Sequence, residues 1–94
     1  MKSFGVYLRK TREEKQLPLR KVAAALDIDT SILSKIERNE RRATIEMIPV
    51  FCEIFDKPKK EIQTEYIKSL ITSDLGELKY LDVGLKEILK TLAK

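Results

Sequence analysis

The sequence contains no histidine, and Cys52 is its one cysteine. Without histidine or a second cysteine, the usual transition-metal sites and an internal disulfide are excluded. The chain also lacks a glycine-rich phosphate loop and any convincing set of nucleophile and base, and Glu13 and Glu14 have the pattern of ordinary helix-surface charges. We therefore expect neither an enzyme nor a bound cofactor, and Cys52 is expected to pack as a small apolar residue.

Long apolar runs are missing as well. No segment approaches the run of about 18 apolar residues that a membrane span needs, and the start MKSFGVYLRK lacks the apolar stretch of a signal peptide. We expect a cytoplasmic protein without a membrane partner. Its 94 residues make one small domain with limited apolar surface, which favours a dimer.

The positive charge is concentrated in the first half of the chain. Residues 1–43 hold eleven Lys or Arg against six Asp or Glu, a net +5, whereas residues 44–94 hold eight against nine, a net −1. A polyanionic partner for the first half is the direct electrostatic interpretation. The alternative is a solvated basic face with no partner.

Residues 26–39, LDIDTSILSKIERN, are the most informative segment. The alanines of residues 23–25 allow the preceding helix to lie close to the next one, Ile28 can fill the turn, and Asp29 stands where an N-cap is needed. Leu33 and Ile36, three apart, can face inward. The polar residues left outside form a ridge that fits a DNA major groove: Thr30, Ser31, Ser34, Lys35 and Arg38.

Helical periodicity dominates the chain, which predicts an all-α fold. We expect helices over residues 3–16 with Ser3 as N-cap, over 19–26 after Pro18, and over 30–38 with Asn39 beyond the end. A fourth helix is predicted from an N-cap at Thr44 to residue 55, bent at Pro49, and a fifth over residues 58–72.

A final helix is predicted after Asp74, which can act as its cap. Leucine and isoleucine recur there at spacings of three and four and form a stripe for dimerisation: Leu78, Leu81, Leu85, Ile88 and Leu92. Leu75 and Leu89 widen the stripe, so the helix is expected to bury this face against the fifth helix and a second subunit together. Gly84 within the helix is easier to understand if another backbone comes close. Packing on the fifth helix of the same chain is the alternative.

Residues 7–55 resemble the XRE family of helix-turn-helix proteins, which includes lambda Cro and the phage repressors. The matching stretches are LRKTREEKQL, VAAALDIDTSILSKIERN and IEMIPVFCEIF. The resemblance implies a compact five-helix domain whose third helix enters the major groove, and a role in transcription. We accordingly expect a DNA-binding core over residues 1–57, and C-terminal helices over 58–94 that complete the core and dimerise.

The resemblance also implies roles for single residues. Arg12 and Glu37 should form a partly buried ion pair that sets the angle of the recognition helix, the alternative being two exposed charges worth under about 1 kcal/mol. Base contacts are expected from Thr30, Ser31, Ser34 and Lys35, with Ile32 against a thymine methyl, although Thr30 or Ser31 can instead cap the helix locally. Phosphate contacts are expected from Arg38, Asn39, Arg41, Arg42 and, secondarily, Arg20.

Three positions depart from the family pattern. Leu19 stands where a glutamine commonly contacts DNA, so the second helix is expected to grip DNA less directly. Asp27 and Asn39 replace frequent glycines, but both residue types tolerate a positive φ. Asp27 and Asp29 also add negative charge near the phosphates.

The sequence as a whole predicts a small bacterial or phage transcriptional regulator. We expect a homodimer that binds an inverted-repeat operator in double-stranded DNA and acts as a repressor by blocking polymerase. An antitoxin or an interaction adapter, with a protein partner on the C-terminal helices, is the alternative function.

Overall fold

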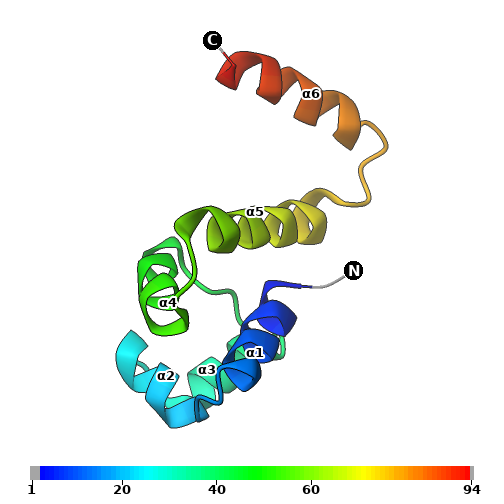
Figure 1. Cartoon of the computed structure of the whole chain (residues 1–94). Coiled ribbons are helices and arrows are strands. Elements are labelled where there is room, and N and C mark those ends of the chain that lie inside the picture. The colour runs from blue at the N-terminus through cyan, green and yellow to red at the C-terminus, as the bar shows by residue number, and fades with distance from the viewer. Residues whose placement is uncertain (1–2, 94) are drawn as a thin grey trace.

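The computed structural model describes residues 3–93, which form six α-helices, one 3-10 turn and no strand. The all-α prediction is confirmed. In chain order the elements are α1 (Phe4–Glu14), α2 (Leu19–Leu26), α3 (Thr30–Glu37), η1 (Ile45–Met47), α4 (Ile48–Phe55), α5 (Lys59–Leu75) and α6 (Leu81–Leu92). Helices α1 to α5 pack together, whereas α6 stands apart beyond α5 (Figure 1).

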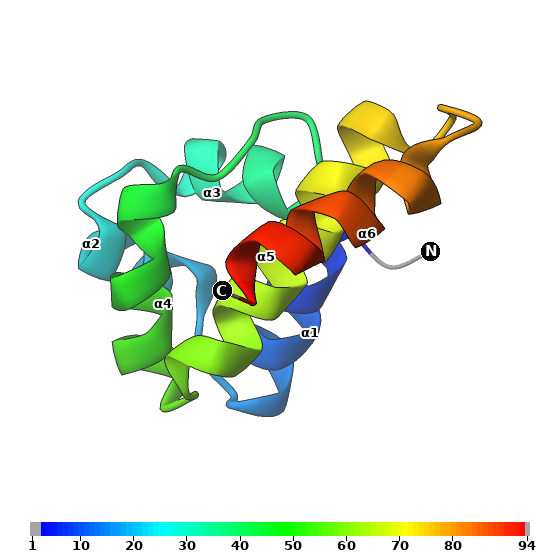
Figure 2. The ribbon, with the colours of Figure 1, turned by 90° about the horizontal axis from the view of Figure 1, so that it is seen from above.

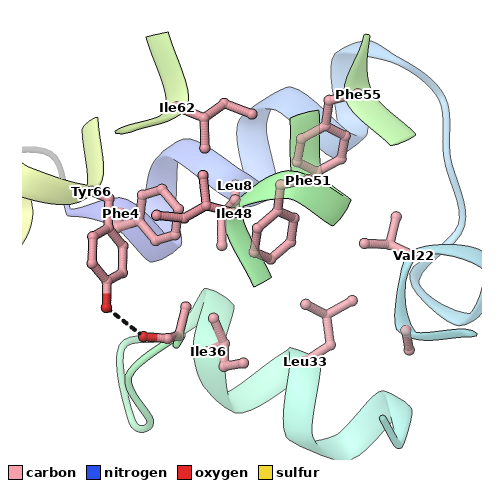
Figure 3. Close-up of a cluster of buried hydrophobic side chains, with 12 residues drawn as sticks. Phe4, Leu8, Val22, Leu33, Ile36, Ile48, Phe51, Phe55, Ile62 and Tyr66 are labelled. Atoms are coloured by element: carbon pink, nitrogen blue, oxygen red, sulfur yellow. Dashed lines mark hydrogen bonds between the residues drawn. The ribbon is translucent and has the colours of Figure 1, made fainter. Parts of the chain in front are cut away.

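An apolar core holds α1 to α5 together (Figure 3). The ring of Phe4 meets the rings of Phe51 and Tyr66 edge-on, with centroids 6.0 and 5.1 Å apart, and such edge-to-face pairs add to the gain from area burial. All five of these helices supply the rest of the buried large side chains: Leu8, Val22, Leu33, Ile36, Ile48, Phe55 and Ile62. Because α5 contributes Ile62 and Tyr66, the packed unit runs past residue 57.

Helix α6 gives the molecule an extended outline. The radius of gyration is 14.7 Å, against about 12 Å for a compact domain of this length. No residue of α6 is buried. Helix α6 lies across α5 in the view from above (Figure 2), and α5 lies between α6 and the α2–α3 pair in Figure 1. The prediction that α6 packs on α5 of the same chain is therefore not met.

Four helices end in the same way, and none uses glycine. Gln16, Asp27, Asn39 and Asp56 have φ values of 56, 57, 62 and 52°, and none of the three glycines, which all lie within residues 3–93, has a positive φ. After each, the next N–H donates to the carbonyl five residues back, as Ile28 does to Ala23 at 3.0 Å. This is the Schellman motif, so aspartate and asparagine replace the usual glycine as predicted.

The predicted helix starts differ in how they are capped. The Ser3 hydroxyl accepts from the Val6 N–H at 3.2 Å, as predicted. Asp29 and Thr44 occupy N-cap positions, but neither side chain makes a capping bond.

The fourth helix was predicted incorrectly. It does not run unbroken from Thr44 with a bend at Pro49, because residues 45–47 form the 3-10 turn η1 and the α-helix begins at Ile48. Pro49 thus lies in the first turn of α4, where its missing N–H needs no partner. In an α-helix that began at Thr44, Pro49 would have no N–H to donate to the carbonyl four residues earlier. The 3-10 turn over residues 45–47 avoids this loss.

The start of the last helix was also predicted incorrectly. Asp74 does not cap it, because α5 continues to Leu75 and contains Asp74. Leu78 lies in the connection before α6, so the predicted stripe begins at Leu81. A Cβ added at Gly84 would meet nothing within 4 Å, so no other backbone of the described chain lies close to it.

Candidate nucleic-acid interface

Helices α2 and α3 form a helix-turn-helix. Ala23 is 1 % exposed and faces the core, and the left-handed Asp27 reverses the chain between the helices. The Ile28 side chain packs against the core from the turn, and its N–H donates to Ala23. The turn is therefore held by a backbone bond on one side and by an apolar plug on the other.

Helix α3 divides cleanly into an inner and an outer face. Leu33, Ile36 and Glu37 are buried, and Ile32 packs partly against the core. The exposed predicted DNA contacts on α3 and at its end are Thr30, Ser31, Lys35, Arg38 and Asn39. Ser34 is half-buried. Because Ile32 is committed in part to the core, less of it is available to a thymine methyl than predicted.

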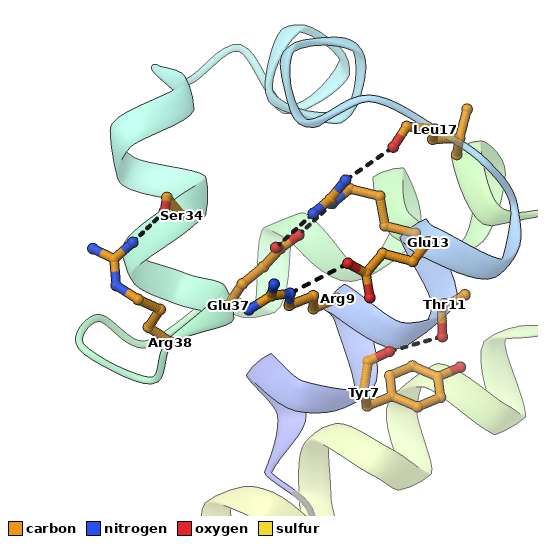
Figure 4. Close-up of polar contacts among 9 residues, drawn as sticks. Tyr7, Arg9, Thr11, Glu13, Leu17, Ser34, Glu37 and Arg38 are labelled. Carbon is orange, nitrogen blue, oxygen red and sulfur yellow. Dashed lines mark hydrogen bonds and ion pairs between the residues drawn. The ribbon is translucent and has the colours of Figure 1, made fainter.

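The inner end of α3 is tied to α1 by Arg12 and Glu37. Arg12 Nε lies 2.7 Å from Glu37 Oε2 and Arg12 Nη2 lies 3.1 Å from Oε1, a bidentate pair. The two side chains are only 14 % and 6 % exposed. Arg12 Nη1 also donates to the Leu17 carbonyl at 3.0 Å (Figure 4). The hydrogen bonds that Arg12 donates to Glu37 raise the pKa of Arg12, so its guanidinium stays charged.

Gly5 brings α1 directly against the end of α3, and sequence reasoning missed it. A Cβ at Gly5 would lie 2.6 Å from Asn39 Oδ1 and 2.8 Å from the Glu37 carbonyl oxygen, which no side chain can do without a shift. An unexplained glycine inside a predicted amphipathic helix was the available signal. Gly5 and the Arg12–Glu37 pair together fix α3 on α1.

Two predicted DNA contacts are bonded to one another at the outer end of α3. Arg38 donates to Ser34 Oγ (Figure 4), and Arg38 Nε lies 2.7 Å from Glu40 Oε2. This pairing raises the pKa of Arg38 and lowers the pKa of Glu40. Glu40, which sequence reasoning did not single out, therefore offsets part of the positive charge that Arg38 presents.

The loop after α3 is fixed at both ends. Asn39 is left-handed at its start, and at its end the Tyr66 hydroxyl donates to the Ala43 carbonyl at 2.9 Å (Figure 3). Between them, Arg41 and Arg42 are both exposed. Arg42 is paired with Asp74 of α5. The loop therefore presents its two arginines from a fixed backbone.

The remaining predicted contact, Arg20, is exposed in the first turn of α2. It lies in the same net +5 half of the chain as the loop arginines. Asp27 and Asp29 are exposed at the turn between the two helices. The interface is thus basic at its edges and acidic at the turn.

Within residues 3–93, no group of three or more Cys, Asp or Glu side chains is placed to hold a metal ion. Over the same residues, none of the helices combines the length and apolarity needed to cross a bilayer.

The comparisons with known proteins agree with this geometry. A family model described as helix-turn-helix matches residues 8–62, more than half of the chain. The chain belongs to the XRE-type helix-turn-helix family. The matched range begins in α1 and ends in α5, so it covers the α2–α3 pair and most of the packed unit around it. The match confirms the predicted XRE-type DNA-binding helix-turn-helix, and this family is generally non-enzymatic.

One relative of this helix-turn-helix protein is the HTH-type transcriptional regulator PrpR of Mycobacterium tuberculosis (strain ATCC 25618 / H37Rv). The two are 28 % identical over 82 residues, which cover 87 % of this chain and 16 % of PrpR. The chain thus spans about a sixth of the length of this relative. No solved structure matches the chain.

Proposed function

We propose that this helix-turn-helix protein is a sequence-specific transcriptional repressor that binds an inverted-repeat operator as a homodimer. The observation that carries the proposal is a polar α3 ridge on a rigid support. Lys35 is exposed on that ridge, while the buried Glu37, two residues on, is bonded to Arg12. A recognition helix held in one orientation does not have to be ordered when it docks, so little of its binding free energy is lost.

Base reading is assigned to the outer face of α3. Lys35 can reach the O6 and N7 acceptors of guanine, and Thr30, Ser31 and Ser34 can donate to or accept from several base edges. Ser34 would read DNA together with Arg38, to which it is bonded. Ile32 is a secondary contact, because it packs partly against the core.

Phosphate binding is assigned to the exposed cations and amides around the ridge. The group consists of Arg20, Arg38, Asn39, Arg41 and Arg42. A phosphate must compete with Glu40 for Arg38 and with Asp74 for Arg42. Each phosphate neutralised releases counterions, so affinity should fall with salt with a slope of about minus one per contact.

The dimer is assigned to the apolar face of α6. Two copies related by a two-fold axis present their recognition helices to half-sites about 10 base pairs apart. Such a dimer over a promoter blocks polymerase, which is why we propose repression in the cytoplasm of a bacterium or phage host.

A protein-binding function is the second candidate, and one observation favours it. The α6 face is exposed, with Ile88 at 55 % and Leu92 at 73 %, and such a surface also suits an antitoxin or an adapter. Binding of a foreign protein in place of a second copy would separate this function from the dimeric repressor.

In vitro selection tests the proposed function. Random duplex DNA is bound to the purified protein at near-physiological salt, and the retained fraction is sequenced. An enriched inverted repeat is expected, and Lys35→Ala should lose the preference at one position in each half-site. Salt-sensitive binding without any enriched sequence would overturn base reading and leave a non-specific binder or an adapter.

A further inference from the structure

Helix α6 carries an apolar face that the chain does not cover. Leu81 and Leu85 are half-buried, while Ile88, Leu89 and Leu92 are 55, 63 and 73 % exposed. A helix of 12 residues is marginal in water without tertiary packing. The face therefore needs a partner surface if α6 is to be stable.

A second uncovered apolar surface lies on the same chain, between η1, α4 and α5. It is a groove of about 360 Å³. Ile45 and Ile67 on its walls are 66 % and 53 % exposed. Its other apolar lining residues are Ile48, Pro49, Tyr66 and Leu70, and Lys59 and Gln63 are its polar members. Exposed large apolar residues gathered on one surface of a small domain mark an interaction site.

The helix and the groove match in length. The α5 wall of the groove runs from Lys59 to Leu70, about 17 Å at 1.5 Å per residue. Helix α6, with 12 residues, is about 18 Å long. One helix of this size therefore fills the groove from end to end, with its polar side toward solvent.

The connection between α5 and α6 holds the helix away from this groove in its own chain. The Leu78 N–H donates to the Leu75 carbonyl at 3.0 Å, and the Leu81 N–H donates to the Leu78 carbonyl at 3.2 Å. These two turns give the connection a defined shape, and α6 leaves it without burying any residue on α5. The groove thus stays open to a second molecule.

We infer that two copies of the chain exchange α6, so that the apolar face of each α6 occupies the groove of the other copy. The inference rests on the dimer of the proposed function and names the surface that receives the helix. Gly84 is three residues after Leu81 and four before Ile88, so it lies beside the stripe, and its surroundings are empty within one chain. A partner helix can approach there without meeting a side chain.

The area favours a reciprocal exchange. Half the surface of a helix about 18 Å long and 11 Å wide is about 300 Å². One helix in one groove then buries about 600 Å² in total, which is the size of a crystal contact. Two equivalent contacts bury about 1,200 Å², which reaches the range of specific interfaces. A closed two-fold dimer uses both apolar faces of both copies and leaves no site open for further growth.

Disulfide cross-linking between two different chains tests the exchange. Both chains carry Cys52→Ala, one also carries Ile67→Cys, and the other, made longer by a tag, carries Ile88→Cys. After subunit exchange and oxidation, we expect a mixed dimer about tenfold more abundant than with Thr64→Cys in place of Ile67→Cys, because a packed pair has Cβ atoms within the roughly 4 Å that a disulfide needs. Thr64 is exposed on α5 outside the groove.

The other cross-linking outcomes overturn the inference. Self-linking of Ile88→Cys without the mixed product would mean that the two α6 helices pair with each other. A single chain that carries both Ile67→Cys and Ile88→Cys and forms only an intramolecular disulfide would mean that α6 folds back on its own groove. Neither readout involves DNA, so an operator found by selection would leave the proposed function standing if the exchange failed.

Light scattering supplies a second, independent measurement. Ile67→Glu should convert the dimer to a monomer at concentrations where the wild type is dimeric, because it places a carboxylate in the groove. Thr64→Glu adds the same charge to the same helix outside the groove and should remain dimeric. Both positions are exposed in one chain, so the folded monomer should tolerate each, which circular dichroism checks. A dimeric Ile67→Glu, or a wild type monomeric at every concentration, would overturn the inference.

Discussion

The guanidinium of Arg12 and the carboxylate of Glu37 join the first and third helices through two hydrogen bonds, 2.7 and 3.1 Å long. The pair lies beneath the recognition helix and is almost excluded from solvent. Removal of one partner leaves the other charge buried and unpaired. The free energy of unfolding should therefore respond very differently to single and double substitutions.

We predict that Glu37→Gln or Arg12→Ala lowers the free energy of unfolding by about 3 kcal/mol, because each leaves an unpaired buried charge. The double variant Arg12→Met with Glu37→Leu should recover most of the loss, because an apolar pair needs no desolvation of ions. Chemical denaturation measures all the variants.

The double variant also separates stability from orientation. If the pair sets the angle of α3, the restored protein should still bind its operator more weakly than the wild type. Full operator affinity in a stable double variant would show that the pair serves stability alone.

The hydroxyl of Tyr66 supports the loop that carries Arg41 and Arg42. Tyr66→Phe should cost about 1 to 3 kcal/mol, because the buried Ala43 carbonyl loses its partner. Looser anchoring of the loop should also weaken DNA binding at all sequences. Thermal unfolding and a binding titration measure the two effects, and Tyr80→Phe, at a residue 68 % exposed, is the matched control that should change neither.

Lys35 and Arg42 should affect DNA binding in different ways. Lys35→Ala should relax the base preference at one position per half-site and cost about 1 to 3 kcal/mol on the preferred sequence. Arg42→Ala should weaken all sequences about equally and reduce the salt slope by about one. Titrations of operator and scrambled duplexes over a range of salt concentrations distinguish them. Unchanged binding in both variants would exclude α3 as the reader.

Asp74→Asn should change DNA affinity in the opposite direction to Arg42→Ala. Because Asp74 pairs with Arg42 on the surface, its neutralisation should strengthen DNA binding by up to about 1 kcal/mol at low salt. The gain should vanish when Arg42→Ala is added. A gain that persists in the double variant would mean that Asp74 acts through overall charge.

The elements that local signals define were predicted well. The bounds of α1 to α3 agree with prediction to within two residues, because caps, periodicity and residues that tolerate a positive φ lie next to one another in the chain. At Pro49 two local signals conflict, a cap at Thr44 and the preference of proline for a first helical turn, and the structure follows the proline.

The features that the sequence did not predict depend on packing between distant segments. No residue near Ala43 in the sequence indicates that Tyr66, 23 residues later, donates a hydrogen bond to the Ala43 carbonyl. Asp74 precedes a leucine-rich stretch, which is the pattern of a helix N-cap, but α5 continues past it. The separation of α6 from α5 could not be predicted from periodicity, since an apolar stripe has the same pattern whether its own chain or a second copy covers it.

Gln16 offers a gain in stability. It ends α1 with a φ of 56°, although glutamine, unlike aspartate and asparagine, has no special tolerance for this conformation. Gln16→Gly should raise the free energy of unfolding by about 0.5 to 1 kcal/mol, once the added freedom of the unfolded chain is subtracted. Asp56→Gly should gain less, and Gln16→Ala should gain nothing. A loss of stability in Gln16→Gly would mean that the glutamine side chain itself stabilises the turn.

Tyr7 makes stability depend on alkaline pH. Its hydroxyl donates to Glu61 Oε2 at 2.5 Å, and partial burial, followed by this bond and the Glu61 charge, raises the pKa of Tyr7. A raised pKa in the folded state means that the contribution is fully present below the unfolded value, about 10, and is lost as pH rises toward the folded value. Histidine is the side chain that ordinarily ionises between about pH 5 and 8. Because the chain has no histidine, its stability should change little between pH 6 and 8.

Thermal unfolding of the wild type and Tyr7→Phe at pH 8 and above pH 10 tests this directly. The wild type should lose stability relative to the variant as pH rises, because Tyr7 ionises more easily in the unfolded wild-type chain than in the folded one. The variant has no hydroxyl at this position to ionise. The slope should stay below about 1.4 kcal/mol per pH unit, which is the limit for the release of one proton, because water reaches part of the ring and screens the Glu61 charge. Parallel pH profiles for the two proteins would mean that Tyr7 ionises as easily in the folded chain as in the unfolded one. The Glu61 bond would then contribute no alkaline sensitivity.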